Sequence, residues 1–332
     1  MALRISWSFI GVLPWPNRLY AVAILAQVAA KSSPELTTGI QGALDFRRLW
    51  PRTTREYLDL KLQRSSYWLL RGDRAMPILR PFHRNHRRMQ EGPSSGYSSY
   101  AYLRDREYAQ SPTHFIRAFM LIQDDLKSIF EYVEPSEECL ATFSYRIHEL
   151  LMRTCMEIEA NFKAILSENI YTPKFDKWHR PILNMHVYRT IDVTHHLSAF
   201  EVILPIWNGT PRVMCPFECW KSNQTPSWYR AYNESKHDRQ EEFKKANLDH
   251  LISAVAGLLV VLSAQFGVED FSSGHDGLTI GGHQYHDGEP AIGGFFRVKF
   301  PNDWSDNEIY AFDWEDIRDD PNRFSKFNYD AL

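Results

Sequence analysis

The amino-acid sequence predicts a mainly α-helical fold: an antiparallel helical bundle with an inserted β-hairpin and a small C-terminal β-hairpin. Two stretches carry apolar residues three or four positions apart, which is the spacing of one helix face. A third stretch, 252–266, is apolar nearly all round, as is typical of a helix in the middle of a bundle. The 332 residues, 44% of them apolar, suffice for a sizeable core and exclude a collagen-like, a disulfide-held or a wholly disordered chain.

The first 90 residues differ in composition from the rest of the chain. They hold 13 Arg and 2 Lys against 5 acidic residues, a net charge of +10, whereas the remainder carries −13. No helix or strand period runs through them that could bury apolar area and offset the entropy of ordering. We therefore predict a poorly ordered, Arg-rich leader over 1–90, whose removal up to residue 88 leaves folding intact. A basic arm that binds nucleic acid is the alternative.

The same end of the chain has apolar segments that resemble a signal peptide with small residues at Ala29 and Ala30. Pro14 and Pro16 divide them, and neither piece reaches the about 20 residues that cross a bilayer. The 4 cysteines do not form a disulfide framework. The sequence therefore predicts a cytoplasmic protein with reduced thiols and no membrane partner.

The two apolar stripes predict helices over 112–133 and 138–167. Ser111 and Pro112 supply an N-cap and a first-turn proline for the first helix, and Pro135 stops it. The short turn between the two helices implies that they pack antiparallel.

An insertion over 170–225 follows these helices. Alternating and branched residues at 188–194 and 200–207 predict that it contains a β-hairpin. After the insertion we expect a polar helix over 226–243 and an apolar helix over 246–266, which is too short for a comfortable membrane span. Both belong to the bundle.

The bundle is thus expected over 112–267, and a C-terminal segment over 268–332. That segment begins with a Gly- and His-rich loop. Alternating residues at 295–300 and 307–314, separated by a turn, predict the second small β-hairpin and a frayed acidic tail.

The polar helix carries the most informative cluster of side chains. Arg230, Asn233 and His237 lie at i, i+3 and i+7 and therefore project from one helix face. They combine a fixed cation, an amide and a group that titrates near neutrality, a set that phosphodiester chemistry can use as catalytic residues. Lys236 and Arg239 add positive charge that would bind a polyanionic substrate.

This arrangement resembles the HEPN superfamily, whose members carry an Arg, a polar residue and a His on a late helix of a small bundle. By position, Arg230 and His237 correspond to the motif Arg and His, and Asn233 to the polar residue. Tyr232 stands directly before Asn233, where the commonest family form has its Arg, and we assign it to substrate binding.

The resemblance covers roughly 112–167 and 226–267. HEPN proteins are helical bundles, usually dimers, and many are metal-independent ribonucleases of toxin–antitoxin, phage-defence or RNA-processing systems. The resemblance therefore implies an RNA partner, a homodimer, an antitoxin or another protein as a further partner, and no cofactor or metal. The alternative function is a non-catalytic dimeric adaptor or sensor, in which the same helix face is an ordinary solvated surface.

A second polar group lies on the helix predicted over 138–167. Glu157 and Asn161 are at i, i+4 and are expected to support the Arg230 helix from across the bundle, with plain surface polarity as the alternative. Glu159 and Lys163 are expected to form an ordinary surface pair.

Metal and nucleotide chemistry find little support in the sequence. His283 and His286 have ligand-like spacing, but they stand in a Gly-rich loop that offers no rigid support for a metal. The chain has no Walker A loop, no dinucleotide-binding fingerprint, no nucleophile elbow and no HExxH motif. These absences disfavour nucleotide-cofactor enzymes, serine hydrolases and zinc proteases of known type.

Overall fold

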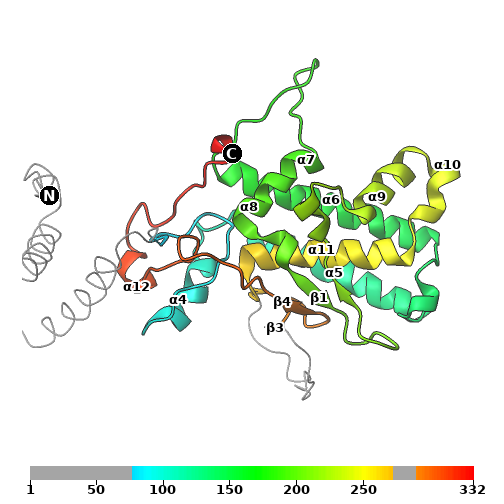
Figure 1. Cartoon of the computed structure of the whole chain (residues 1–332), viewed down its shortest axis with the longest axis horizontal. Helices are drawn as coiled ribbons and strands as arrows, with labels where there is room; N and C mark the ends of the chain where they lie inside the picture. The colour runs from blue at the N-terminus through cyan, green and yellow to red at the C-terminus, as the bar shows by residue number, and fades with distance from the viewer. Residues whose placement is uncertain (1–76, 272–288) are drawn as a thin grey trace, which may run out of the picture. The chain divides into compact units, whose positions relative to one another are not determined.

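The computed structural model describes residues 77–271 and 289–332. The chain divides after Met76, and the unit Pro77–Leu332 is described by itself. This unit is mainly helical and contains a small antiparallel sheet (Figure 1). Residues 1–76 of the leader expected over 1–90, and the segment around His283, lie outside the described residues.

The elements of the described residues follow one another in this order. The α-helices are α4 (Ser95–Ala101), α5 (Pro112–Phe130), α6 (Tyr145–Glu168), α7 (Met185–Tyr188), α8 (Asp192–His195), α9 (Ser227–His237), α10 (Arg239–Glu242), α11 (Leu248–Phe266) and α12 (Trp314–Ile317). The strands are β1 (Glu201–Ile203), β2 (Val213–Met214), β3 (Glu289–Pro290) and β4 (Arg297–Lys299). Single 3₁₀ turns are η3 (Tyr102–Arg104), η4 (Glu137–Cys139), η5 (Arg189–Ile191), η6 (Leu197–Ala199), η7 (Glu218–Ser222), η8 (Phe243–Lys245) and η9 (Tyr329–Ala331).

Helices α5, α6 and α11 form the bundle that the apolar stripes predict, and α5 and α6 run antiparallel (Figure 1). Helix α6 begins later than predicted, because the Ser144 hydroxyl accepts a hydrogen bond from the amide of Ile147 (3.2 Å) and caps the helix there. Ser111 occupies the N-cap position of α5, but it has a left-handed backbone (φ 50°) and makes no side-chain cap. Helix α5 ends at Phe130, before Pro135.

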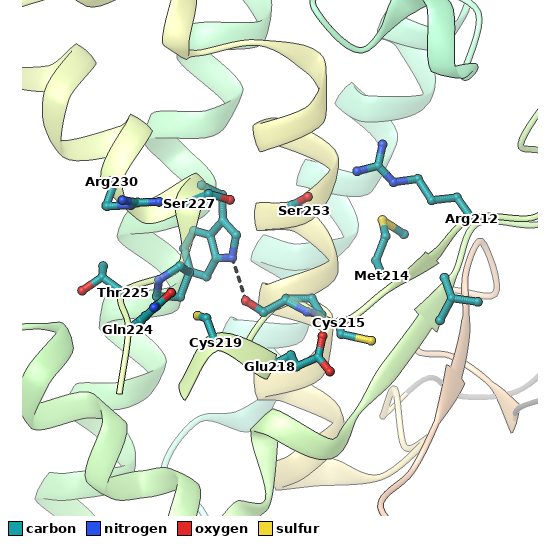
Figure 2. A pocket seen from close by; sticks show the side chains of 14 residues that line it. Arg212, Met214, Cys215, Glu218, Cys219, Gln224, Thr225, Ser227, Arg230 and Ser253 are labelled. Carbon is teal, nitrogen blue, oxygen red and sulfur yellow. Dashed lines mark hydrogen bonds between the residues drawn. The ribbon is translucent and has the colours of Figure 1, made fainter. Parts of the chain in front are cut away.

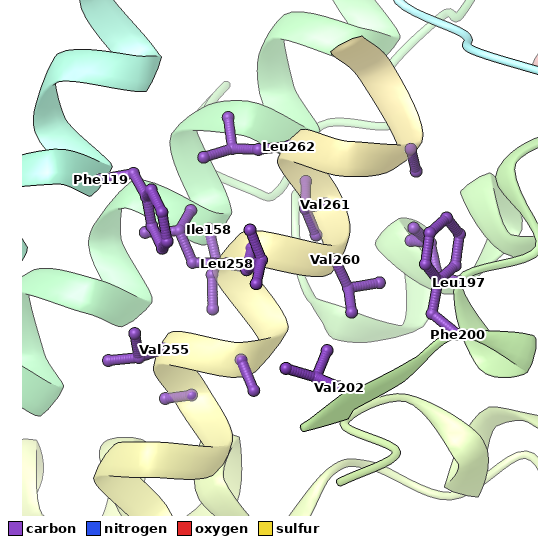
Figure 3. Close-up of a cluster of buried hydrophobic side chains, with 14 of the residues drawn as sticks. Phe119, Ile158, Leu197, Phe200, Val202, Val255, Leu258, Val260, Val261 and Leu262 are labelled. Atoms are coloured by element: carbon purple, nitrogen blue, oxygen red, sulfur yellow. The ribbon is translucent and has the colours of Figure 1, made fainter. Parts of the chain in front are cut away.

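Helix α11 is the centre of the core, as its apolar sequence predicts. It is long and apolar enough to cross a membrane, yet most of its surface is buried inside this unit. Figure 3 shows Phe119 and Ile158 on one side of the helix and Leu197 and Val202 on the other. Helix α11 is therefore enclosed by α5 and α6 on one face and by the β1 region on the opposite face.

The small sheet has the strand order β2-β1-β4-β3, with every neighbouring pair antiparallel. At its centre Val202 of β1 pairs with Val298 of β4, and both side chains are fully buried. The insertion and the C-terminal segment thus contribute one antiparallel pair each, β1–β2 and β3–β4, and the β1–β4 pairing joins the two pairs into one sheet.

The hairpin predicted between 188–194 and 200–207 is wrong in its first half. Residues 185–199 form short helical turns instead, because the Asn184 side chain caps them by accepting from the amides of His186 and Val187. The Thr194 hydroxyl bonds back to the carbonyl of Ile191 (2.9 Å), a contact that a helical turn allows. The insertion does contain an antiparallel pair, β1–β2, so the hairpin exists with β1 as its first strand rather than its second. Strand β1 also pairs with β4.

The C-terminal segment does contain a small antiparallel pair, β3–β4, but the hairpin predicted between 295–300 and 307–314 is wrong in its second strand. Strand β4 lies within the first stretch, but it pairs with β1 and β3. Tyr310, in the second stretch, forms parallel bridges with Ile78 and Met89.

The predicted boundary of the leader at residue 90 is wrong, because residues 77–90 belong to the folded unit. The amide of His86 bonds to the carbonyl of Ala264 at the end of α11 (2.8 Å). The Tyr310 hydroxyl donates to the carbonyl of Asn85 (2.8 Å). This segment therefore lies between the end of α11 and the C-terminal tail.

The physical reason for this difference is Arg84, which is fully buried in spite of its charge. Its Nε donates to the Glu168 carboxylate (2.6 Å), and a second nitrogen donates to Oε1 of Gln265 (2.9 Å). The remaining nitrogen donates to the carbonyl of Gln110, and the guanidinium packs over the ring of Phe115. A buried arginine is tolerated when it is paired and hydrogen-bonded in this way.

Candidate functional site

The candidate site is built on α9, which is held in the bundle by aromatic side chains. Trp228, Tyr229 and Tyr232 are buried, and the Trp228 indole donates to the carbonyl of Pro216 (3.0 Å; Figure 2). The helix predicted over 226–243 breaks after His237. There Asp238 leaves the helical conformation and caps the short helix α10 through its side chain.

The opposite side of α9 is a polar stripe that faces solvent. Ser227, Arg230, Glu234 and His237 are exposed and lie at successive spacings of three or four, which places them on one helix face. Glu234 on this stripe pairs with Lys245 (3.0 Å). Hence Arg230 and His237 project from the same face of α9, as their spacing predicts.

Arg230 also lines a pocket of about 390 Å³ that opens beside the first turn of α9 (Figure 2). Arg212 and Arg230 stand at opposite ends of this pocket, and Glu218 lies on its wall. The Arg212 side chain is paired with Asp249. The Arg230 side chain has no hydrogen-bond or ion-pair partner among the described residues, so its cation is free to meet an anion.

Two cysteines complete the wall of this pocket. Burial raises the pKa of the Cys215 thiol, and burial likewise raises the pKa of Cys219 in opposition to the nearby Arg230. Thiols with raised pKa values are poor nucleophiles at neutral pH. The pocket therefore offers a cation and polar walls rather than a reactive thiolate.

Asn233 lies beside the stripe, is half-buried and is linked to α6 through Tyr229. The Tyr229 hydroxyl donates to the carboxylate of Glu159 (2.9 Å), and the Asn233 side chain hydrogen-bonds to the same hydroxyl. Burial, followed by the charge of Glu159, raises the pKa of Tyr229 well above its usual range. Glu159 also pairs with Lys163 (3.6 Å), as predicted, but its bond to Tyr229 was not anticipated from the sequence.

The two residues assigned to substrate binding on α9 have different environments. Tyr232 is buried with 2% of its surface exposed, so the structure does not support a contact with substrate. Its hydroxyl accepts a hydrogen bond from Lys236 (3.2 Å), which itself is exposed. Arg239 begins α10, and its side chain lies outside the part that the structure describes.

Asn161 and Glu157, expected to support α9, do not reach it. Asn161 is fully buried and accepts a hydrogen bond from Gln265 (3.0 Å), which joins it to the buried cluster around Arg84. It also donates to the main-chain carbonyl of Glu157 (2.9 Å). Among the described residues, the polar bond from α6 to α9 is made by Glu159, which is two positions from both Glu157 and Asn161 and therefore about half a turn round the helix.

Arg230 and His237 share a face but do not converge on one point within a single chain. Seven residues of α-helix rise by about 10 Å, and a long side chain leans toward the N-terminus of its helix. The Arg230 guanidinium therefore leans away from His237. One phosphate, with an extent of a few ångström, does not bridge the two groups of the same helix.

In residues 77–271 and 289–332 no group of three or more His, Cys, Asp or Glu side chains is placed to hold a metal. Comparisons with protein-family models, with curated proteins and with solved structures found no match to this chain. The function of the chain is therefore inferred from the geometry of α9 and its pocket.

Proposed function

We propose that the protein binds RNA through the exposed face of α9 and cleaves it without a metal, at a site shared by two copies of the chain. The observation that supports the proposal most is the polar stripe of α9. On this stripe an arginine without a partner in the described residues and an exposed histidine stand on one face. The buried aromatic side of the same helix holds this face toward solvent.

The proposed chemistry is attack by a ribose 2′-hydroxyl on the adjacent phosphate. This reaction needs proton transfer at the attacking or leaving oxygen and stabilisation of the negative charge that develops on phosphorus oxygens. His237 would move the proton, and Arg230 would hold the phosphate through its guanidinium. Lys236 would add positive charge at the same end of the helix.

A homodimer would bring the two groups together. In a two-fold pairing of antiparallel α9 helices centred between Asn233 and Glu234, Arg230 of one copy lies opposite the partner's His237. The same symmetry forms a second, identical site. Glu234 falls near the axis, where its pairing with Lys245 lowers the cost of bringing two carboxylates close together.

The direct test is a cleavage assay with a single-stranded RNA, the matching DNA and a chelator. We expect RNA to be cut in the presence of the chelator, and DNA to remain intact because it lacks the 2′-hydroxyl. His237→Ala should abolish cleavage with a modest loss of binding, while Arg230→Ala should reduce both. Arg146→Ala, at an exposed arginine of α6, is the matched control. Cleavage that persists in His237→Ala, or that requires Mg²⁺, contradicts the proposal.

Mixing the two impaired variants tests whether the site is shared. Subunit exchange between Arg230→Ala and His237→Ala chains makes heterodimers in which one of the two sites has both groups intact. With random pairing at equal amounts, cleavage should recover to about a quarter of the wild-type rate. No recovery, despite proven exchange, would place both groups in a site of one chain and refute the shared site.

A second candidate function is a dimeric adaptor without chemistry. It is favoured by the separation of Arg230 and His237 along a single helix. Light scattering that shows a dimer, together with no cleavage of any RNA tested, would support the adaptor over the ribonuclease.

A further inference from the structure

The loop between α6 and α7 projects beyond the helices as a narrow finger (Figure 1). We define the finger as residues 174–182. Its two limbs are joined by an antiparallel bridge between Phe175 and Pro181, and the amide of Ile182 bonds to the carbonyl of Lys174 (2.7 Å). The finger is thus a short ribbon with its own hydrogen bonds.

The tip of the finger is organised by Asp176. One oxygen of its carboxylate accepts hydrogen bonds from the amides of Trp178 (2.8 Å) and Arg180 (2.9 Å), and the other accepts from the Arg180 side chain (3.0 Å). His179 has a left-handed backbone with φ 58°. A tip fixed in this way loses little conformational freedom when it binds a ligand.

The fixed tip presents an exposed aromatic ring with two cations close to it. Trp178 is 63% exposed, an unusual position for the largest apolar side chain. The Lys177 ammonium lies 4.2 Å from the centre of its ring, and the Arg180 guanidinium lies 4.9 Å from it. Phe175, on the limb below, is 58% exposed.

We propose that the finger binds single-stranded RNA by stacking a base on Trp178, while Lys177 and Arg180 contact the phosphates on either side. Stacking on an exposed aromatic ring flanked by cations is the common way of holding single strands. This proposal rests on the proposed function, since it names a second contact for the same RNA. A membrane is the alternative ligand for an exposed tryptophan. The charged residues around Trp178 disfavour it, because insertion of the ring would move Asp176 and two cations into the apolar layer.

The finger is connected to the α9 pocket through the short helices that follow it. At its base Thr172 bonds to Asp330 through both its amide (2.8 Å) and its hydroxyl (2.7 Å), which anchors the finger to the C-terminal tail. Arg189, after α7, donates to the carbonyl of Asn223 (3.0 Å), and Gln224 next to it lines the pocket that Arg230 borders. These bonds fix the base of the finger to the same part of the fold that borders the α9 pocket.

The test measures binding of the full-length protein to a fluorescein-labelled 2′-O-methyl oligoadenylate of about 12 nucleotides, a length that single-strand binding sites occupy. The 2′-O-methyl group removes the nucleophile, so binding is measured apart from cleavage. Trp178→Ala should weaken binding about 5- to 100-fold, whereas Trp178→Phe should keep most of it. Lys177→Gln should reduce the salt dependence of binding by about one phosphate contact. Tyr132→Ala, at a residue that is 87% exposed between α5 and α6, is the matched control.

The outcomes separate this proposal from the proposed function. Cleavage of RNA together with unchanged binding by Trp178→Ala overturns the finger and leaves the α9 site standing. Binding that depends on Trp178, with no cleavage of unmodified RNA, supports the finger and overturns the ribonuclease. Trp178-dependent binding to vesicles of phosphatidylcholine and phosphatidylglycerol, without binding to the oligonucleotide, assigns the finger to a membrane and refutes the proposal.

Discussion

Replacing Arg84 tests the packing of the segment that enters the core between α11 and the C-terminal tail. In the variant Arg84→Met the ion pair with Glu168 and the hydrogen bond to Gln265 are both lost. Glu168 has only 9% of its side chain exposed, so water cannot fully replace the guanidinium. The carboxylate keeps one hydrogen bond, from the amide of Gln110 (3.0 Å).

The expected loss follows from the cost of leaving one member of a buried pair alone. Removing one partner of a buried ion pair costs about 3–5 kcal/mol, a large part of the ~5–15 kcal/mol that stabilises a typical protein. For a unit of this size each 1 kcal/mol lowers Tm by about 2–4 °C, so Arg84→Met should lower Tm by about 6–20 °C. Arg146→Met removes an exposed pair with Glu149 and should cost less than about 1 kcal/mol.

A double-mutant cycle measured by urea unfolding checks this reasoning. Arg84→Met, Glu168→Gln and the double variant should show a coupling of about 0.5–3 kcal/mol, because the two side chains touch. Additive losses within about 0.5 kcal/mol would mean that the pair contributes nothing beyond its separate parts. A loss for Arg84→Met no larger than that for Arg146→Met would refute the structural role of the buried arginine.

Two further predictions concern the same region. A chain that begins at Met89 should fail to unfold cooperatively in a thermal scan, because it lacks the buried Arg84 and Asn85. A chain that begins at Pro77 should keep a cooperative transition. Equal melting of the two chains would contradict the packing of residues 77–88. Burial lowers the pKa of His195 to about 3 from its usual 6.5. Between these pH values the unfolded chain binds a proton at this residue and the folded chain does not. This contribution to stability is complete above about pH 6.5 and is lost as the pH falls toward 3, by at most about 1.4 kcal/mol per pH unit. Urea midpoints at pH 7 and pH 5.5 measure it. His195→Gln should reduce the difference, and the remainder comes in part from His86, whose pKa burial lowers to about 4.

Local patterns in the sequence predicted the helices well and the strands poorly. The stripes of α5 and α6 and the apolar run of α11 are spacings within one segment, so they can be found without knowledge of the rest of the fold. The pairing of Val202 with Val298 joins residues that are far apart in the chain, and no local pattern specifies it. The insertion and the C-terminal segment each hold an antiparallel pair, as predicted, but most of the paired residues differ from those predicted, and the pairing of β1 with β4 that joins them was not predicted.

The error over residues 77–90 has the same origin. Composition marks an Arg-rich segment as unfit for a core, since an unpaired charge is expensive to bury. Whether a charge is paired depends on residues elsewhere, and the partners of Arg84 are Glu168 and Gln265, 84 and 181 positions away. Asn161 was assigned to the wrong cluster for the same reason, because its partner Gln265 lies on α11.

The orientation of α9 could be predicted because the helix has two chemically distinct sides. Trp228 and Tyr232 occupy one side, and rotating the helix by about a quarter turn would expose these rings and bury Arg230 without a partner. The bond from Trp228 to the carbonyl of Pro216 fixes the rotation further. The direction in which Arg230 and His237 point is thus set by packing on the far side of the helix. The rise of the helix keeps the two side chains of one copy apart, so they act together only if a second copy supplies the missing group. Mixing the Arg230→Ala and His237→Ala variants measures that dependence.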